Sequence, residues 1–187
     1  MQNERNKAGS GEPQPMRKVL DCDSPILRKK SKPITKIDDD LIDLIKEMFV
    51  IMKTTAPKGI GFAAPQIGEL IRLVVIDYGE GEMVFINPEI LSREGECIYK
   101  EGCLSIPGLW ADVKRAEKIR FACTNLRGKR VEGEATGILA RVLQHEIDHL
   151  DGKLFTDYIE PGQEIELDEG VTLPKRFQEK LMKGDKK

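Results

Sequence analysis

Hydrophobic residues recur at helical spacing in two stretches of the chain. The first follows the acidic run 38–40, which can cap a helix, and its apolar positions continue to Met52, before the polar and proline-containing run 54–57. The second begins near Thr136 and ends at Gly152, a residue type that commonly follows a helix C-terminus. Most of the positions in the second stretch are apolar, which predicts a helix packed under a sheet.

Other stretches have the apolar runs or the alternation that are typical of β-strands. The expected strands are 72–77, 83–87, 97–100, 118–124 and 129–134. The last two are separated by a short turn, so the second of them is expected to return antiparallel to the first. The segment 101–108 is expected to be a compact turn. The pattern therefore mixes strands with two helices in a single folded unit.

Composition divides the chain of 187 residues into three parts. Residues 1–16 are polar and rich in Gly and Pro, which predicts a disordered tail. Residues 17–160 carry most of the apolar residues and are long enough to form one domain with its own core. Residues 161–187 are charged and predict a polar tail, with a short helix over 173–182 as a candidate element.

The charge balance argues against several classes of partner. The chain has 30 basic and 32 acidic residues and a net charge of −2, which offers no electrostatic reason to bind nucleic acid or an anionic membrane. No apolar run approaches the roughly 20 residues of a membrane helix. No secretory signal precedes the four cysteines, which are therefore expected to be reduced thiols of a cytoplasmic protein.

The second helical stretch holds the chain's only two histidines, in the sequence His145-Glu146-Ile147-Asp148-His149. Residues at i and i+4 share a helix face, so both imidazoles can bind one metal ion, with Glu146 near a water on that ion. The face is largely apolar, and metal binding would satisfy imidazoles that are costly to bury unpaired. These are parts of a metal-activated hydrolase, although so short a pattern also occurs by chance.

Spacing alone does not identify a third metal ligand. No histidine lies downstream, and the downstream carboxylates lie in a polar segment: Asp157, Glu160 and Glu164. Cys103 would complete a site of two histidines and one cysteine with one position open for water. It can equally be a small core residue, as free cysteines usually are. The pattern of residues does not separate Cys103 from Cys97 or Cys123.

The loop 59–68 is rich in glycine and superficially matches a dinucleotide-binding fingerprint. Its context excludes that reading, because a helix precedes it and Pro65 prevents a helix from opening at once. The glycines are expected to allow close approach of a strand or an extended substrate. The amide of Gln66 either holds the loop by hydrogen bonds or donates to a developing oxyanion.

Three segments together resemble the signature motifs of the peptide deformylase family. They are 59–66 (GIGFAAPQ), 101–105 (EGCLS) and 144–149 (QHEIDH), within a similarity that runs from about Val19 to Tyr158. The resemblance implies a small α+β fold, in which the helix that carries the metal ligands lies among antiparallel strands. It also implies a hydrolase that removes the N-formyl group from the N-terminal methionine of newly synthesised polypeptides and releases formate.

The resemblance selects Cys103 as the third ligand beside His145 and His149. It implies one divalent metal ion, with Fe(II) in the cell and zinc, nickel or cobalt as substitutes, and a mixed sulfur and nitrogen ligand set suits these metals. Glu146 is implied to take the proton of the attacking water and to deliver it to the leaving amine. The implied oxyanion donors are the Gln66 amide and the Leu104 N–H.

The peptide is expected to lie extended beside Ile60 and Gly61, with its methionine in an apolar pocket that includes Ile60, Val142 and the His145 ring. Trp110 follows the cysteine motif outside the matched segments and is expected on the substrate rim, with a core position as the alternative. Arg115 is expected to be structural, through a carboxylate. The expected substrate-binding residues are Ile60, Gly61, Gly102, Val142 and Trp110.

The implied partners are N-formylmethionyl nascent peptides, with transient proximity to the ribosome, and the protein is expected to be a monomer without nucleic acid or membrane binding. The expected location is the bacterial cytoplasm, with an organellar mature form as the alternative. Two other functional classes share part of the pattern. A zincin-type metallopeptidase has the helix motif but needs a different third ligand and cuts internal peptide bonds. A non-catalytic metal-binding or nascent-chain-binding module would retain the fold without turnover.

Overall fold

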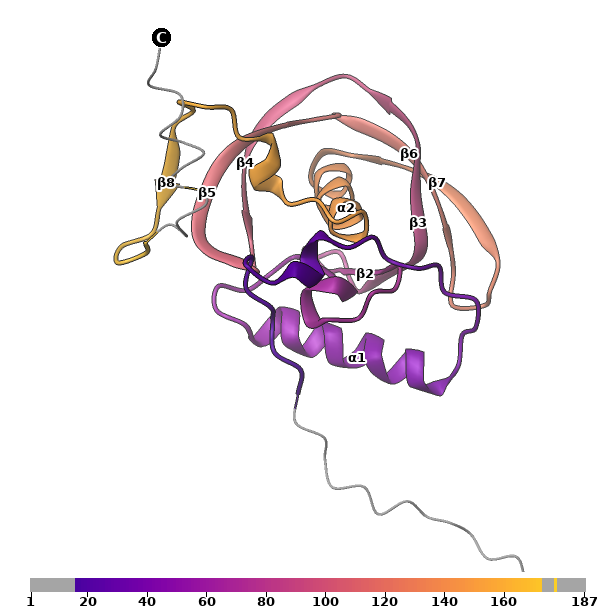
Figure 1. Ribbon diagram of the computed structural model, residues 1–187. Helices are drawn as coiled ribbons and strands as arrows, with labels where there is room; N and C mark the ends of the chain where they lie inside the picture. Colours follow the sequence, from indigo (N-terminus) through magenta and orange to yellow (C-terminus); the bar gives the residue numbers. More distant parts are fainter. Residues whose placement is uncertain (1–15, 173–176, 178–187) are drawn as a thin grey trace, which may run out of the picture.

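The computed structural model describes residues 16–172 and Phe177. The predicted N-terminal tail and the candidate helix over 173–182 lie almost entirely outside these residues. Two antiparallel sheets surround the helix α2 (Gly137–Leu150), and a second helix, α1 (Asp39–Thr54), lies across the outside next to β2 (Figure 1). The predicted α+β fold with a central helix among antiparallel strands is confirmed.

The larger sheet has the strand order β1-β2-β3-β6-β7 and the smaller one the order β4-β5-β8. Every strand pair in both sheets is antiparallel. The strands are β1 Gly61–Ala63, β2 Leu73–Ile76, β3 Met83–Glu94, β4 Cys97–Cys103, β5 Ile106–Arg115, β6 Lys118–Thr124, β7 Arg130–Thr136 and β8 Ile165–Leu167. Short 3-10 turns occur at η1 Pro25–Arg28, η2 Ala64–Ile67 and η3 Phe155–Tyr158.

The helix α1 forms where the apolar periodicity predicts it. The Asp38 carboxylate accepts a hydrogen bond of 3.1 Å from the Leu41 N–H and so caps the N-terminus. The buried face includes Ile45, Met48 and Met52, which pack with residues of β1 and β2 in one core cluster. This cluster supports the start of the larger sheet from outside, so α1 holds β1 in place beside the site.

The helix α2 also forms where it is predicted, and two of its long polar side chains are buried. Strands cover most of its circumference, and Arg141 and Gln144 are buried. The Gln144 amide accepts a hydrogen bond from the Ala116 N–H and donates one to the Ala116 carbonyl, which satisfies it inside the fold. Conversely, the apolar residue Ile138, near the N-terminus of the helix, is 51% exposed.

The segment 101–108 is a hairpin rather than an isolated turn. Cys103 of β4 pairs with Ile106 of β5, so only Leu104 and Ser105 turn, and both flanks are strands. The strand β5 is not predicted by the hydrophobic pattern, because its inward positions include a small residue, Ala111, and it lacks a continuous β-branched run. The hairpin places Cys103 at the edge of the smaller sheet, facing α2.

The strand β8 lies in the part of the chain that is expected to be a polar tail. It pairs with β5 through Leu109↔Leu167, Trp110↔Glu166 and Ala111↔Ile165. Composition does not predict this strand because pairing with an existing edge satisfies backbone groups whatever the side chains are.

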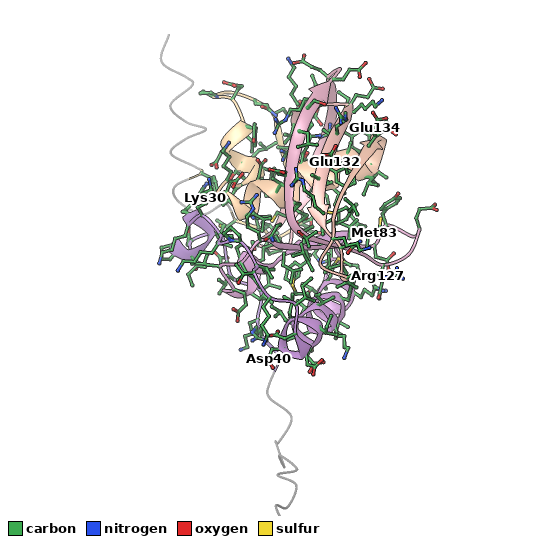
Figure 2. All side chains as sticks on the ribbon, turned by 90° about the vertical axis from the view of Figure 1, so that its right-hand side faces the viewer. Lys30, Asp40, Met83, Arg127, Glu132 and Glu134 are labelled. Carbon is green, nitrogen blue, oxygen red and sulfur yellow. The ribbon has the colours of Figure 1, made fainter. Side chains whose placement is uncertain are left out.

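Charged side chains of both signs are spread over the surface, among them Lys30, Asp40, Arg127, Glu132 and Glu134 (Figure 2). This distribution agrees with the balanced net charge of −2. Within residues 16–172, neither α-helix has the length and apolar character needed to cross a membrane.

Candidate active site

Two elements bring together three side chains that could bind one metal ion. His145 and His149 project from one face of α2, and Cys103 approaches them from the end of β4. The Cys103 Sγ lies 3.3 Å from His149 Nε2, and one candidate ligand atom of each residue lies within 4.8 Å of the others. The three residues named as metal ligands therefore converge on one point, although Cys103 and His149 are 46 positions apart in the chain.

The chemistry of these donors fits a divalent transition metal. The set offers one thiolate and two imidazoles, which suits late first-row ions. His145 Nδ1 lies 2.9 Å from Glu101 Oε2, so this nitrogen is occupied and Nε2 is left for the ion. A carboxylate behind a histidine ligand is the usual way in which proteins fix the ring and its tautomer.

The two imidazoles have opposite electrostatic environments. Burial lowers the pKa of His149 well below its ordinary value, and the neighbouring His145 adds to this effect. Burial also opposes a charge on His145, but hydrogen bonds with Cys103 and Glu101 outweigh it and raise the pKa of that ring. The interactions that favour a proton on His145 also favour a metal ion at its Nε2.

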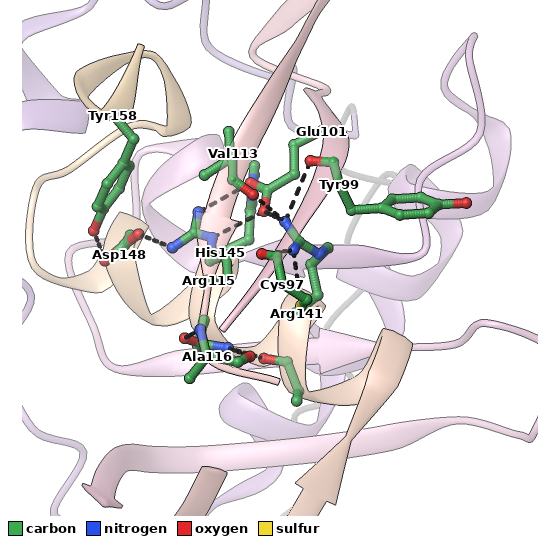
Figure 3. Close-up of polar contacts among 12 residues, drawn as sticks. Cys97, Tyr99, Glu101, Val113, Arg115, Ala116, Arg141, His145, Asp148 and Tyr158 are labelled. Carbon is green, nitrogen blue, oxygen red and sulfur yellow. Dashed lines mark hydrogen bonds and ion pairs between the residues drawn. The ribbon is translucent and has the colours of Figure 1, made fainter. Parts of the chain in front are cut away.

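Glu101 is the centre of a buried ionic network behind the metal ligands (Figure 3). Its carboxylate accepts hydrogen bonds from Arg115 Nε at 2.8 Å, Arg115 Nη2 at 3.0 Å and Arg141 Nη1 at 2.7 Å. Burial alone would raise the pKa of Glu101, but hydrogen bonds from His145 and Arg115 lower it far below its usual range. The carboxylate is therefore ionised and keeps His145 oriented.

The carboxylate contact expected for Arg115 is confirmed. Its guanidinium binds Glu101 on one side and Asp148 on the other, and Tyr158 donates a hydrogen bond of 3.1 Å to the same Asp148 (Figure 3). The Arg115 guanidinium also lies over the Tyr158 ring, 4.8 Å from its centroid. Arg115 thus connects β5 to the polar side of α2.

Arg141 is a site residue that the sequence pattern does not reveal. It lies one helical turn before His145, and it donates to the carbonyls of Cys97 and Val113 at 2.9 Å each and to Glu101 (Figure 3). These bonds join α2 to both β4 and β5. Its position at i−4 from a ligand is the one signal in the sequence that could have indicated this role.

Glu146 lies between His145 and His149 in the sequence of α2 and lines the same cavity as His145. Its Oε2 is buried and has no hydrogen-bond partner among the described residues. Burial raises the pKa of this carboxyl to about 7, partly opposed by the charge of His145. A Cβ built on Gly61 would come within 2.6 Å of Glu146 Oε1, so only glycine leaves this room for the side chain. A carboxyl with a pKa near neutrality can both accept and deliver a proton.

Gln66 and Leu104 adjoin Cys103. Gln66 Oε1 accepts a hydrogen bond of 2.8 Å from the Ala63 N–H, which turns the Gln66 Nε2 toward Cys103 Sγ at 3.5 Å and Ser105 Oγ at 3.4 Å. Leu104 follows Cys103 directly at the hairpin turn and also lines the cavity. The two amide groups named as oxyanion donors are thus near the candidate metal position.

A cavity of about 600 Å³ opens beside these groups. Gly61 lies against the cavity residue Val142, since a Cβ on this glycine would come within 2.5 Å of Val142 Cγ1. The cavity is lined mainly by apolar surface, as small-molecule and peptide side-chain pockets usually are. All the residues named as substrate contacts border it: Ile60, Gly61, Gly102, Val142 and Trp110.

Comparison with known proteins shows which family has a similar sequence and fold. The family model of polypeptide deformylase matches residues 16–164. A peptide deformylase of Dictyoglomus turgidum is 47% identical over 142 residues, which cover 76% of this chain and 90% of the relative. One of Alkalilimnicola ehrlichii is 48% identical over 145 residues, covering 75% and 80% of the two chains.

Solved structures agree with the sequence relatives. The crystal structure of a peptide deformylase from Legionella pneumophila is similar with a TM-score of 0.76 and 41% identity, covering 90% of this chain and 95% of the other. That of a peptide deformylase from Synechococcus elongatus in complex with actinonin has a TM-score of 0.75 and 34% identity, covering 92% and 89%. The protein belongs to the peptide deformylase family, metal-dependent hydrolases that remove the N-formyl group from the N-terminal methionine of polypeptides.

Proposed function

We propose that Cys103, His145 and His149 hold the metal of a deformylation site in which Glu146 transfers the proton. The observation that carries the proposal is the position of Glu146, whose buried carboxyl lines the same cavity as Cys103 and His145 and has an oxygen without a hydrogen-bond partner among the described residues. The cellular metal is Fe(II), with zinc, nickel or cobalt able to take its place in the same mixed sulfur and nitrogen site.

Each residue of the site has a separate role in hydrolysis. A bound divalent ion supplies Lewis acidity toward the formyl carbonyl and activates water for the attack. Glu146 accepts the proton of the attacking water and delivers it to the leaving amide nitrogen, so that formate and a free amino group are released. Gln66 Nε2 and the Leu104 N–H donate hydrogen bonds to the oxygen on which negative charge develops.

The substrate lies extended between the two sheets. The strands β1 and β4 are each at the edge of a sheet, and Gly61 and Gly102 of these strands border the cavity. A peptide can therefore add main-chain hydrogen bonds along an unpaired edge. Its methionine side chain points to the apolar surface of Val142 and the His145 ring. The alternation of an extended chain sends the next side chain to the other face of the peptide.

The substrates are N-formylmethionyl nascent polypeptides, met in the cytoplasm close to the ribosome by a monomeric enzyme. The exposed apolar side chains near the cavity support contact with an extended chain. Tyr99 and Ile138 are 69% and 51% exposed beside the opening. Exposed apolar surface grouped at a cavity mouth is typical of a binding site.

Substitution of Glu146 by Gln tests the proposed reaction. Gln fills the same space but cannot accept the proton, so formate release from a formyl-Met peptide should fall on the order of 10²–10⁴-fold. Metal content, measured on the same anaerobic preparation, should stay at the wild-type level because Glu146 is not a ligand. Glu80→Gln makes the same chemical change at an exposed position and should leave turnover unchanged. Undiminished release by the Glu146 variant would refute the proton transfer.

A further inference from the structure

The segment that follows the family match packs against the wall of the active-site cavity. The match ends at residue 164, and β8 begins at Ile165. The strand β8 pairs with β5 on the side opposite β4, so β5 lies between β8 and the metal-ligand strand (Figure 1). The backbone of β8 therefore contacts the cavity wall through β5.

Trp110 of β5 contacts both β4 and the residue that follows β8. Its neighbours Leu109 and Ala111 point into the core, whereas Trp110 is half-buried and lines the cavity. The six-membered ring lies over Gly102, where a Cβ would come within 2.7 Å of it. At the other end of the indole, Nε1 donates a hydrogen bond of 3.1 Å to Asp168 Oδ1. The ring is therefore held between β4 and the residue that follows β8.

Backbone hydrogen bonds hold Asp168, the acceptor of the indole hydrogen bond, in place. The Asp168 N–H donates to the Gly108 carbonyl at 2.9 Å, and the Val171 N–H donates to the Asp168 carbonyl at 3.1 Å. Val171 packs directly on Gly108, whose φ of 77° and lack of a side chain leave space for it. An ion pair between Lys100 of β4 and Glu166 of β8 spans β5 next to Trp110. The turn 168–171 is thus a folded part of the wall.

We propose that Asp168 is a positioning residue that holds the Trp110 indole over Gly102, and that this ring selects the residue following methionine in the substrate. The inference rests on the proposed function, because it uses the extended peptide along β4. With methionine directed to Val142, the next side chain points to the face of β4 on which Gly102 and Trp110 lie. An indole face fits large apolar or aromatic side chains.

The selectivity of wild-type protein and variants tests the proposal with two peptides, formyl-Met-Phe-Ser-amide and formyl-Met-Gly-Ser-amide. The wild type should prefer the phenylalanine peptide in kcat/KM. Asp168→Ala frees the ring and should reduce this preference by about three- to tenfold, mainly through KM for the phenylalanine peptide. Asp168→Asn keeps an oxygen acceptor for the indole N–H and should retain the preference. Glu169→Gln changes an adjacent exposed carboxylate and should leave both peptides unaffected.

Tryptophan fluorescence gives a second readout, because Trp110 is the only tryptophan in the chain. Acrylamide quenching should increase in Asp168→Ala and stay at the wild-type level in Asp168→Asn and Glu169→Gln. A freed indole with unchanged peptide preference would overturn the role in selectivity. Unchanged quenching in Asp168→Ala would overturn the positioning role. An equal decrease of kcat/KM for both peptides in both Asp168 variants would overturn it as well. Failure of the proposed function is distinct: the wild type would then release no formate from either peptide, while the quenching experiment would still report on the ring.

Discussion

At the scale of single residues, the carboxylate of Glu101 forms several buried hydrogen bonds within the site. It accepts hydrogen bonds from two arginines and from His145, one of the proposed metal ligands, all of them buried. Removing a charge from such a group leaves the guanidinium groups of Arg115 and Arg141 without a full counter-charge in a low-dielectric interior. The identity of the residue two positions before Cys103 therefore matters for folding as well as for catalysis.

Glu101→Gln should lower the free energy of unfolding by about 3–5 kcal/mol, the usual effect of breaking a buried charge network. The same change removes the anionic partner of His145 and should weaken metal affinity about 10–100-fold. Urea unfolding and a metal titration with a competing chelator measure the two effects. Glu80→Gln, at an exposed loop position, serves as the control and should alter neither. Wild-type metal affinity in Glu101→Gln would contradict the orienting role.

Gly61 determines the position of Glu146 by its lack of a side chain. In Gly61→Ala the new methyl group would lie within 2.5 Å of Val142 Cγ1 and 2.6 Å of Glu146 Oε1, so both must move. A displacement of a catalytic group by about 1 Å commonly costs about 10²-fold in rate. The kcat/KM of Gly61→Ala should therefore fall about 10²-fold. Formate release measured at low and at saturating substrate concentrations gives this value. Gly128→Ala, in the open β6–β7 turn, should cost stability without this loss of activity.

At the scale of elements, α2 is attached to the smaller sheet mainly by polar contacts. Arg141 reaches the carbonyls of Cys97 and Val113, while Gln144 binds both backbone groups of Ala116. These bonds satisfy backbone groups of β4, of β5 and of the turn that follows β5. They also determine how close β4, and with it Cys103, lies to the two histidines.

Arg141→Met retains length and apolar contacts but removes the donors. It should destabilise the protein by about 1–3 kcal/mol for each buried acceptor left unsatisfied. Amide hydrogen exchange should increase first in β4, because β4 is an edge strand that pairs only with β5 in the smaller sheet. Arg141→Lys keeps the charge without the planar fork and should recover part of the stability. Exchange that increases uniformly over both sheets would argue against a local role in holding β4.

At the scale of the whole molecule, a metal ion would link the two sheets through α2. Since Cys103 belongs to β4 and the histidines to α2, an ion bound by all three stabilises only the folded chain. At a free concentration of 1,000 times Kd the stabilisation is about 4.1 kcal/mol. A chelator should therefore lower Tm, and readdition of the metal should restore it.

Cys103→Ala should abolish most of this metal-dependent change in Tm, measured by anaerobic calorimetry with and without chelator. Cys123→Ala removes a buried core thiol on β6 and should lower Tm while leaving the metal-dependent increment intact. Full metal loading and full activity in Cys103→Ala would refute the ligand set and favour a metallopeptidase arrangement with a different third ligand.

Local patterns in the sequence were sufficient for the features that depend on neighbours along the chain. The periodicity after residue 38 and after Thr136 predicted both α-helices to within about two residues, and helix geometry alone placed His145 and His149 on one face. Adding the resemblance of three motifs to a family gave the fold class, the activity and Cys103. Each of these inferences rests on residues that are close in sequence or on motifs that are long enough to be specific.

Tertiary structure alone decided which distant groups meet. The burial of Arg141, the second partner of Arg115 and the pairing of β8 with β5 all depend on contacts between segments far apart in the chain. A polar side chain in a helix is predicted to be exposed unless the carbonyl groups that accept its hydrogen bonds are known. A short strand is stabilised by pairing with a sheet edge formed elsewhere in the chain. The sequence by itself determined the two helices and the histidine pair. Long-range packing determined the orientation of His145 by Glu101 and the wall that Trp110 forms.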